Sequence, residues 1–251
     1  MCADWPSLHR PGRLALTNMR VVAIVPAYQA ANTVGLVVSD LVRLWPAWAG
    51  APAVVAVDDG SSDQTASRAE AAGAVVVRHR HNRGKGAALR TGLARALELG
   101  ADAAVTVDAD GQHPAEEAVR LAELDVPTTT LVLAVRDLAL AGAPRASQFS
   151  NRISNFFLSR FSGAKLRDTQ CGLRRYPVEG TLGLGASSDG YAYEAEVVLR
   201  AARARWPIEQ VPVRVFYPPP DERVSHFHVV RDPARIIGTV LRTLADTARP
   251  R

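Results

Sequence analysis

The sequence predicts an α/β protein with one mostly parallel sheet that is covered by helices on both faces. Two observations support this fold class. Short apolar runs alternate with segments of helical periodicity up to residue 135, which is the order that parallel strands and their crossover helices require. The apolar runs are rich in Val and Ala along their length, as is typical of strands buried on both faces. The 251 residues are enough for one large domain with a substantial core.

The first half of the chain contains the strands and helices on which this prediction depends. The predicted strands are residues 21–25, 53–57, 74–77, 103–107 and 131–135. The predicted helices between them are residues 33–45, 64–73, 84–99 and 114–124. Open parallel sheets bind their ligands at the carboxyl ends of the strands. Because polar motifs directly follow the first, second, fourth and fifth strands, we expect a functional site at this edge of the sheet.

The order of the elements changes after Arg136. The predicted elements are a loop over 137–145, an amphipathic helix over 148–161, an irregular polar segment over 166–176, a helix over 191–205, a strand over 208–216 and a last amphipathic helix over 232–245. Three consecutive prolines at 218–220 interrupt the chain before that last helix. We expect a flexible extension over residues 1–19 and a single domain over residues 20–251.

The composition excludes several classes of protein. The formal net charge is +5, and Lys85 and Lys165 are the only lysines, so arginine carries nearly all of the positive charge. This surplus suits a nucleotide, a lipid phosphate or a membrane surface, but its pattern does not predict a nucleic-acid partner. Cys2 and Cys171 do not form a disulfide framework. Neither a signal core nor a run of roughly 18 apolar residues is present, so we expect a cytoplasmic protein.

The segment over residues 105–114 gives the strongest indication of chemistry. An apolar strand leads directly into Asp108 and Asp110, and side chains two residues apart on extended backbone point to the same side. Their carboxylates can therefore converge on one divalent cation, with Gln112 as a third oxygen ligand. Mg²⁺ and Mn²⁺ accept such oxygens and leave positions for substrate phosphates. The alternative is a solvated Asp-Gly turn, but polar motifs at the other strand ends favour the metal site.

Two adjacent acids, Asp58 and Asp59, end the second strand. They begin the sequence Asp-Asp-Gly-Ser-Ser-Asp, in which Ser62 or Asp63 can cap the helix that follows. A capped turn explains those two residues, but it does not explain two neighbouring carboxylates that repel each other. A carboxylate at this position can accept hydrogen bonds from a nucleobase or from ribose hydroxyls, so we favour a nucleotide-binding role for Asp58 or Asp59.

Two later loops combine basic residues with glycines. Residues 82–86, Asn-Arg-Gly-Lys-Gly, precede a helix, where the backbone can approach a phosphate, although a glycine-rich N-cap is an alternative. Residues 168–175 carry an acid and two arginines, which either bind a ligand or form a structural pair. We interpret His113 as a helix-start residue rather than a ligand. The segment 225–228 lacks the cysteines or third histidine of a zinc site.

Taken in order, these motifs resemble the family 2 inverting glycosyltransferases. The resemblance depends on Pro26-Ala-Tyr28, Asp58-Asp59, Asn82-Arg-Gly-Lys-Gly86, Asp108-Ala-Asp110 with Gln112, and Asp168-Thr-Gln-Cys-Gly-Leu-Arg174. It extends over about residues 21–237 and is greatest for the dolichyl-phosphate mannose synthase and polyprenyl-phosphate glycosyltransferase branch. It implies a GT-A fold with a Rossmann-like nucleotide-sugar half over 20–113, a continuous acceptor half over 114–230, and a C-terminal amphipathic helix and tail over 231–251.

The resemblance also implies roles for individual residues. The donor, a UDP- or GDP-hexose, would be held by Pro26, Ala27, Tyr28, Asp58, Asp59, Lys85, Asp108 and Ala109. The metal ion, Mg²⁺ or Mn²⁺, would be held by Asp108, Asp110 and Gln112. The catalytic residues would be Asp110, Arg136, Arg145, Arg152, Asp168 and Arg174. Among these, Arg136 would meet a lipid phosphate, with Arg145 or Arg152 as a second arginine. Asp168 and Arg174 would belong to a loop that closes over the site.

Departures from the branch bear on the donor and on the acceptor. Gln29-Ala30 replaces the Asn-Glu that often follows the Pro-x-Tyr motif, and Val224-Ser225-His226 replaces a late Gly-x-Ser-Lys segment. Many relatives with sugar acceptors carry an adjacent pair of acids near the helix that begins here at residues 189–194, and this chain has none. An alcohol acceptor needs such a general base, whereas a phosphate is already an anionic nucleophile. This difference favours a polyprenyl phosphate acceptor.

We therefore predict a metal-dependent inverting transferase that moves a hexose to a polyprenyl phosphate at the cytoplasmic face of a membrane. Membrane contact would be peripheral or through a membrane partner subunit. The surface elements expected to make it are the loop 137–145 and the helix 148–161, with Phe149, Phe156, Phe157, Leu158 and Phe161. Two alternatives stay open: glycosylation of a soluble or glycan hydroxyl, and a non-catalytic nucleotide-sugar-binding subunit. The absence of a Gly-rich loop after the first strand disfavours a nucleotidyltransferase.

Overall fold

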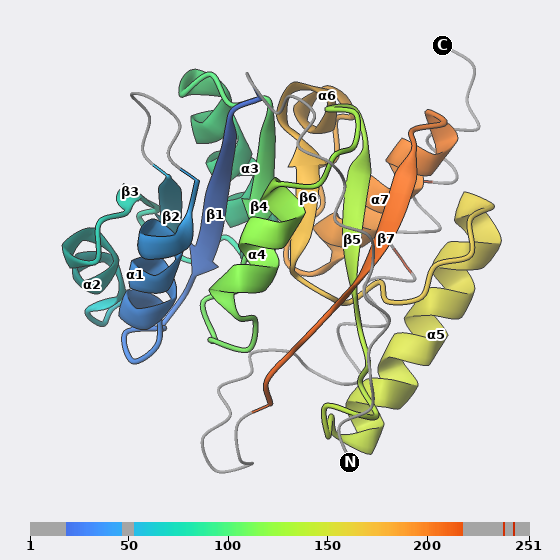
Figure 1. The fold of residues 1–251 in the computed structure, drawn as a ribbon, viewed down its shortest axis with the longest axis horizontal. Helices are drawn as coiled ribbons and strands as arrows, with labels where there is room; N and C mark the ends of the chain where they lie inside the picture. Colours follow the sequence, from blue (N-terminus) through green and yellow to red (C-terminus); the bar gives the residue numbers. More distant parts are fainter. Residues whose placement is uncertain (1–18, 47–52, 218–237, 239–242, 244–251) are drawn as a thin grey trace.

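A computed structural model describes residues 19–46 and 53–217, together with Gly238 and Thr243 (Figure 1). The predicted N-terminal extension therefore lies outside the described residues except for Met19. The prolines at 218–220, the segment 224–228 and most of the predicted last helix lie outside them as well.

One seven-stranded sheet organises the described chain, in the order β3-β2-β1-β4-β6-β5-β7. The strands are β1 (Val21–Ala27), β2 (Val54–Asp58), β3 (Val75–Arg78), β4 (Ala103–Thr106), β5 (Leu131–Arg136), β6 (Arg174–Pro177) and β7 (Ile208–Val213). Only β6 among these runs antiparallel to its neighbours, β4 and β5. The predicted mostly parallel sheet is confirmed. Strands from both predicted halves share this sheet, and the division into donor and acceptor halves stays a prediction.

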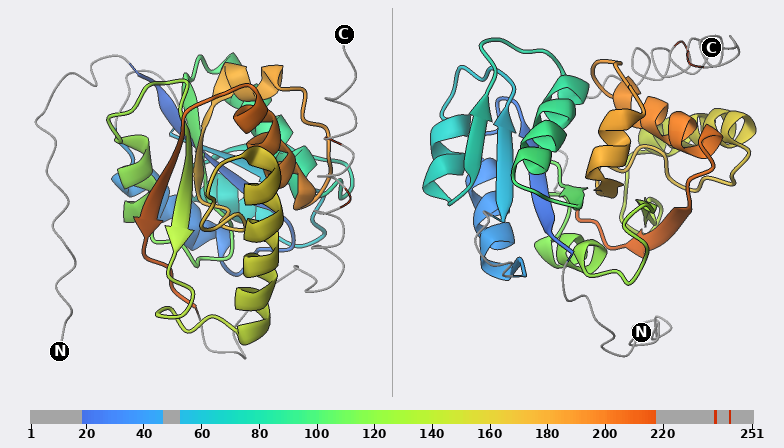
Figure 2. Two further views of the ribbon diagram at one scale, coloured as in Figure 1. Left: turned by 90° about the vertical axis from the view of Figure 1, so that its right-hand side faces the viewer. Right: turned by 90° about the horizontal axis from the view of Figure 1, so that it is seen from above.

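Helices cover both faces of the sheet, as predicted (Figure 2). One face is covered by α1 (Val34–Leu44) and α4 (Ala115–Ala122), with α2 (Thr65–Ala71) beside α1. The other face is covered by α3 (Lys85–Glu98), α5 (Arg145–Ser162), α6 (Val178–Gly183) and α7 (Ala192–Arg203). Each strand and helix predicted in the first half is present, with ends that differ by a few residues.

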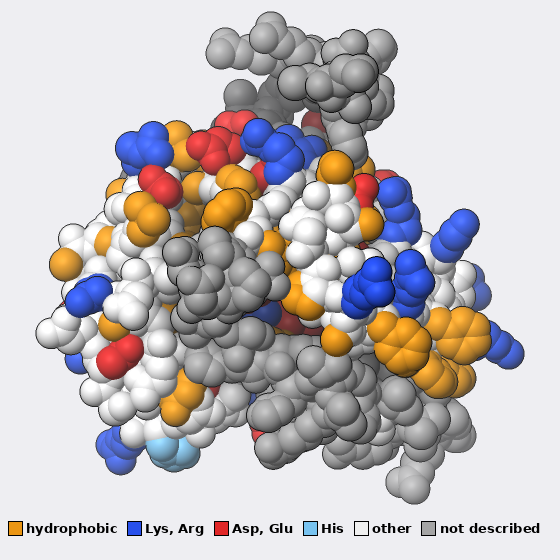
Figure 3. Space-filling model, turned by 90° about the horizontal axis from the view of Figure 1, so that it is seen from below, with side chains coloured by type: hydrophobic (Ala, Val, Ile, Leu, Met, Phe, Trp, Pro, Cys, Tyr) orange, Lys and Arg blue, Asp and Glu red, His pale blue; other side chains and the backbone are white. Residues whose placement is uncertain are grey.

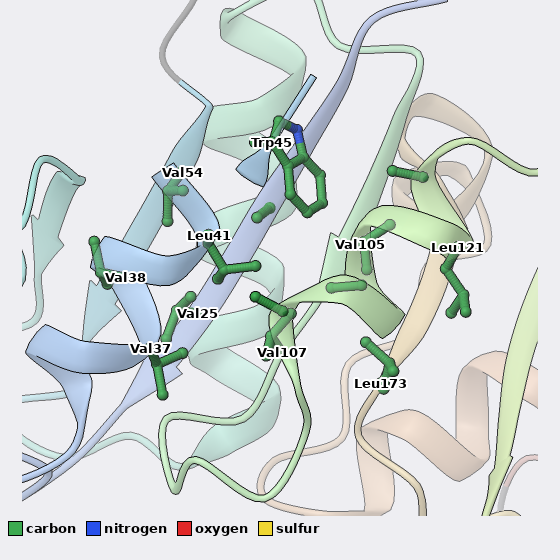
Figure 4. Close-up of a cluster of buried hydrophobic side chains, with 14 of the residues drawn as sticks. Val25, Val37, Val38, Leu41, Trp45, Val54, Val105, Val107, Leu121 and Leu173 are labelled. Atoms are coloured by element: carbon green, nitrogen blue, oxygen red, sulfur yellow. The ribbon is translucent and has the colours of Figure 1, made fainter. Parts of the chain in front are cut away.

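The two layers of core follow from the alternation of side chains along β1. Val21, Ala23 and Val25 pack toward α1 and α4, where the cluster in Figure 4 also contains Leu41. Val22 and Ile24 pack toward α3 and α7. Helix α3 lies especially close to β1, because a β-carbon at Gly92 would come 2.4 Å from Cγ2 of Ile24. Strands β1, β2, β4 and most of β5 are therefore buried on both faces, as their composition predicted, whereas β3 at the edge of the sheet is only partly buried.

The prediction of an irregular segment over residues 166–176 was wrong at its C-terminal end. Residues Arg174–Pro177 form β6, an interior strand of the sheet. Arg174 and Arg175 are fully buried there, because their guanidinium groups donate to backbone carbonyls. Three smaller differences are that α5 begins three residues before the predicted start at 148, that β7 ends at Val213 instead of the predicted 216, and that the short α6 was not predicted.

The topology brings the predicted functional segments to one edge of the sheet. The parallel strands β1, β2, β4 and β5 all end at the lower edge in Figure 1. Because β6 is antiparallel, the loop over residues 168–173 that precedes it lies at this edge too. The motifs that are scattered over the sequence can therefore form one site.

Candidate active site

Three charged side chains meet beyond the carboxyl end of β4. Lys85, the first residue of α3, places its Nζ 2.7 Å from Oδ1 of Asp108 and 3.2 Å from Oε2 of Glu194 in the first turn of α7. The ammonium group also lies 5.5 Å from the ring centre of Tyr191. Burial lowers the pKa of Lys85, but the two carboxylates outweigh burial and hold this pKa above its ordinary value. Lys85 is therefore a fixed cation beside the Asp-x-Asp motif.

Two glycines allow this close assembly. A β-carbon at Gly172, in the loop before β6, would lie 2.1 Å from Oδ2 of Asp108. A β-carbon at Gly86 would lie 2.6 Å from the backbone oxygen of Ser188 and 2.7 Å from Cβ of Tyr193. The start of α3 can therefore pack against the start of α7, and the 168–173 loop can pack against Asp108.

The second acid of the motif lies in a different electrostatic environment. Burial, together with the charge of Asp108, raises the pKa of Asp110 to about 6. Its Oδ1 accepts a hydrogen bond of 3.0 Å from the backbone N–H of Gln112. Ala109, between the two acids, is buried. The backbone oxygen of Gln112 accepts a hydrogen bond from the N–H of Phe216, so the segment after β7 crosses the loop that carries the motif.

The two acids at the end of β2 have separate structural partners. The carboxylate of Asp59 accepts hydrogen bonds from the backbone N–H groups of Arg83 and Gly84, at 3.0 and 2.7 Å, and lies 2.6 Å from Nδ1 of His79. Asp59 therefore fastens the loop that leads to Lys85, which does not support the predicted direct contact with a nucleotide. Asp58 uses Oδ1 to accept from the N–H of Ser61, at 3.0 Å.

The motif at the end of β1 lies beside this turn. Pro26 and Ala27 belong to the strand and are buried, and Ala27 pairs with Asp58 of β2. Tyr28 follows at the edge and is partly exposed. Gln29 has a φ of 50° and joins the two strand ends, because its backbone N–H donates to the hydroxyl of Ser61. The three predicted donor-site residues of β1 thus share one edge with Asp58.

On the opposite side of the Asp-x-Asp motif, Arg136 at the end of β5 forms a two-pronged ion pair with Asp168. The Nε atom lies 2.7 Å from Oδ2 and the Nη2 atom lies 3.1 Å from Oδ1. The Nη1 atom donates to the hydroxyl of Tyr217, at 3.3 Å. The side chain of Asp168 is only 1% exposed. Arg136 is thus held rigidly at the strand end by the loop that was predicted to close over the site.

Comparison with known proteins identifies the family. The model of glycosyl transferase family 2 matches residues 22–176, which is more than half of the chain. The chain belongs to glycosyltransferase family 2. An undecaprenyl-phosphate mannosyltransferase from Micrococcus luteus is 30% identical, over 78% of this chain and 83% of that protein. A UDP-N-acetylglucosamine–dolichyl-phosphate N-acetylglucosaminyltransferase from Methanococcus voltae is 26% identical, over 80% and 88%. The predicted branch of the family is therefore confirmed.

Solved structures confirm the GT-A fold of this family 2 glycosyltransferase. A glucosyl-3-phosphoglycerate synthase from Mycobacterium tuberculosis, crystallised with Mn²⁺, UDP-glucose and phosphoglyceric acid, matches with a TM-score of 0.70 at 22% identity. The match covers 94% of this chain and 86% of that chain. At this identity the likeness concerns the fold. Among the described residues of our glycosyltransferase, no helix has the length and apolar character needed to cross a bilayer.

The oxygen donors of this family 2 enzyme fit a hard divalent cation. Asp108 and Asp110 supply two carboxylates close enough to raise the pKa of Asp110, a repulsion that a divalent cation would relieve. Within the described chain, no cluster of three or more His, Cys, Asp or Glu residues could hold a metal. The two carboxylates would occupy only part of the coordination shell of Mg²⁺, which leaves positions for substrate phosphates.

Three further arginines of the glycosyltransferase were predicted to be catalytic, namely Arg174, Arg152 and Arg145. Arg174 is 1% exposed and donates to the backbone oxygens of Cys171, Glu194 and Thr169, at 2.8, 3.0 and 2.7 Å. It fastens the 168–173 loop to α7, so its direct contact with a substrate is not supported. Arg152 lies on the exposed face of α5. Arg145 begins the same helix and is also exposed.

Sequence reasoning missed three residues that complete the site of this family 2 enzyme. Tyr217 directly follows the predicted strand 208–216, so the strand-end pattern that revealed Arg136 also pointed to it. Glu194 carried a weaker signal, as an acid in the first turn of a predicted helix. Gly172 belongs to the motif over residues 168–174, but that motif did not indicate its role, which depends on how closely the loop before β6 approaches Asp108.

Proposed function

We propose that this glycosyltransferase moves a hexose from a nucleoside-diphosphate sugar to a polyprenyl phosphate, with inversion at the anomeric carbon. The observation that carries the proposal is the set of ion pairs and hydrogen bonds made by two acids near the start of α7. Glu194 pairs with Lys85, and Glu196 accepts hydrogen bonds from the N–H groups of Ser187 and Ser188 and from Arg200. The second oxygen of Glu194, Oε1, accepts no hydrogen bond from the described residues but lies 3.7 Å from Nε of Arg174. Both carboxylates are therefore paired with cations at the place where relatives with sugar acceptors carry their general base. An acceptor that is already anionic needs no such base.

The donor would bind at the side of the site formed by β1, β2 and the start of α3. Tyr28 and the carboxylate of Asp58 lie at the strand ends where a base or ribose would fit. Transfer of the sugar leaves new negative charge on the nucleoside diphosphate. A divalent ion bound to Asp108, Asp110 and Gln112 would supply Lewis-acid stabilisation of that charge. Lys85 would add a fixed positive charge nearby without reorganising.

The acceptor would bind at the side formed by β5 and the segment after β7. Arg136 is held in one orientation by Asp168, and a fixed guanidinium suits the planar, bidentate recognition of a phosphate. Its position on the other side of the Asp-x-Asp motif supports attack by a phosphate oxygen on the face of the sugar opposite the leaving group. The relatives from Micrococcus luteus and Methanococcus voltae are named after undecaprenyl phosphate and dolichyl phosphate. Both are lipid phosphates, which agrees with this acceptor class.

A matched pair of acceptors tests the proposal. The purified protein is incubated with Mg²⁺ or Mn²⁺, a panel of UDP- and GDP-hexoses, and either a polyprenyl phosphate or the polyprenol of the same length. We expect a lipid-linked hexose from the phosphate only, with the anomeric configuration opposite to that of the donor. Transfer to the polyprenol or to a free sugar, with none to the phosphate, would overturn the acceptor assignment. Donor binding without transfer to any acceptor would instead indicate a nucleotide-sugar-binding subunit.

A further inference from the structure

The outward face of α5 carries a regular stripe of arginines and phenylalanines. Arg145, Phe149, Arg152, Phe156 and Arg160 follow one another at intervals of four, three, four and four residues, so they share one face of the helix. All five are exposed, and Phe149 and Phe156 expose 65% and 66% of their surface. We call these five residues the α5 stripe. Figure 3 shows aromatic rings between cationic side chains at the edge of the molecule where α5 lies.

The opposite face of α5 anchors the helix to the rest of the protein. Leu158 is fully buried, which corrects its predicted place on a membrane-facing surface. The hydroxyl of Ser154 lies 2.8 Å from that of Thr169, and the amide of Asn155 donates to the backbone oxygen of Arg167, at 2.6 Å. Core packing therefore accounts for the inner face but not for the stripe, whose two phenylalanines expose most of their surface.

From this surface we infer that the α5 stripe docks the enzyme on an anionic lipid bilayer. Helix α5 contains three arginines and no acidic residue, so its surface complements negatively charged head groups. Its 18 residues span about 27 Å, enough for a helix that lies along a membrane surface. Phenylalanine rings between the arginines would enter the boundary between head groups and acyl chains. Leu140, which is 80% exposed in the loop before α5, extends the apolar part of this surface.

Because of where α5 lies in the fold, docking would place the candidate site close to the bilayer. The helix begins nine residues after Arg136, and its first turn lies toward the sheet edge where the candidate site is built (Figure 1). Docking through the stripe would bring that edge next to the bilayer that contains a polyprenyl phosphate. The benefit of docking for the enzyme, which is access to this lipid, depends on the proposed function. The docking itself depends only on the surface of α5 and can be measured without any sugar transfer.

Sedimentation with vesicles tests the docking. The full chain is mixed with vesicles of phosphatidylcholine alone or of phosphatidylcholine with 30% phosphatidylglycerol, at low and high salt. We expect binding to the anionic vesicles that weakens with salt. The double variant Arg152→Gln/Arg160→Gln should bind about twenty- to thirtyfold more weakly, at roughly fivefold per arginine. Its charge-matched control is Arg43→Gln/Arg95→Gln, on α1 and α3, which should bind like the wild type.

The phenylalanines are tested in the same way. The double variant Phe149→Ser/Phe156→Ser should lose most of its binding, whereas Leu36→Ser, which removes an equally exposed apolar side chain from α1, should retain it. Circular dichroism establishes that each variant is folded. Equal binding of the stripe variants and their controls would overturn the proposal, as would wild-type protein that ignores anionic vesicles at low salt. The latter result would leave the proposed sugar transfer intact if activity persists on detergent-dissolved acceptor.

Discussion

Gly172 lies so close to the carboxylate of Asp108 that a β-carbon at this position would lie 2.1 Å from Oδ2. The variant Gly172→Ala must therefore displace either the 168–173 loop or the first acid of the Asp-x-Asp motif. We expect kcat/KM to fall by more than about tenfold, which corresponds to about 1.4 kcal/mol of transition-state stabilisation. Calorimetry should show a matching loss of affinity for UDP or GDP in the presence of Mn²⁺.

A second glycine provides the control for this substitution. A β-carbon at Gly183, the last residue of α6, would meet no described atom within 4 Å, and the backbone there does not need a positive φ. Gly183→Ala should therefore leave kcat/KM and nucleotide affinity unchanged. If Gly172→Ala behaves like Gly183→Ala, the close approach of Gly172 has no role in holding Asp108.

Removal of the second acid tests the metal assignment. In Asp110→Ala, one of the two carboxylates that would bind the cation is lost, so we expect a loss of more than about tenfold in kcat at saturating Mg²⁺. Titration of Mn²⁺ in the presence of nucleotide should show weakened binding. Asp40→Ala, which removes an acid paired with Arg43 on the surface of α1, is the control. Near-normal turnover of Asp110→Ala would rule out Asp110 as an essential ligand.

Most of the fold could be predicted because the first five strands are apolar on both faces and alternate with helices. Strand β6 could not, since two of its four residues are arginines. Arginine in an interior strand is tolerated here only because Arg174 and Arg175 find carbonyl partners in other segments, namely the 168–173 loop, α7 and the end of α4. Such partners are set by tertiary packing, which periodicity does not reveal.

In the site too, features set by the local sequence could be predicted, whereas features set by tertiary packing could not. Asp108, Asp110 and Arg136 could be found because each follows an apolar strand, and parallel strands end at a common edge. The role of Asp59 in holding the loop before α3 could not be predicted. Its partners, Arg83 and Gly84, lie 24 and 25 residues later in the chain. The same holds for Arg174, whose burial depends on where β6 lies in the sheet.

Two substitutions of Arg136, which forms an ion pair with Asp168, should distinguish an effect on folding stability from an effect on acceptor binding. Asp168 is buried, so Arg136→Ala would leave an unpaired carboxylate and reduce the free energy of unfolding by about 3 kcal/mol. Arg136→Lys keeps the charge but loses the two-pronged geometry. We expect Arg136→Lys to remain folded and to raise KM for the polyprenyl phosphate more than about tenfold, with little change in KM for the nucleotide sugar. Equal effects on both substrates would contradict an acceptor role.

The pH dependence of stability should report on Glu117, which joins α4 to the segment after β7. Burial raises the pKa of Glu117, but hydrogen bonds from Arg214 and Arg120 outweigh it and bring the pKa below its ordinary value of 4.5. A lowered folded-state pKa adds stability above pH 4.5, and this stability is lost as the pH falls through the folded-state value.

Urea unfolding of Glu117→Gln provides the measurement. At pH 7 the variant should be less stable than the wild type by about 1–2 kcal/mol. The difference should be constant from pH 7 down to about 5 and should shrink below pH 4.5, as Glu117 becomes protonated in the wild type as well. Glu116→Gln, at the exposed neighbouring position of α4, should show no such difference. A deficit that grows on acidification would show that the carboxylate does not stabilise the fold.

Substitution of Glu194 tests whether the acceptor is a phosphate or a hydroxyl group. If it served as a general base, Glu194→Gln would lose roughly 10²–10⁴-fold in rate and flatten the acidic limb of the pH profile. We expect a loss of no more than about tenfold with polyprenyl phosphate, and an unchanged profile shape, because Glu194 only helps to position Lys85, 3.2 Å away. Glu179→Gln, at an exposed position of α6, is the control. A loss of a thousandfold together with an altered profile would contradict base-free transfer to a phosphate.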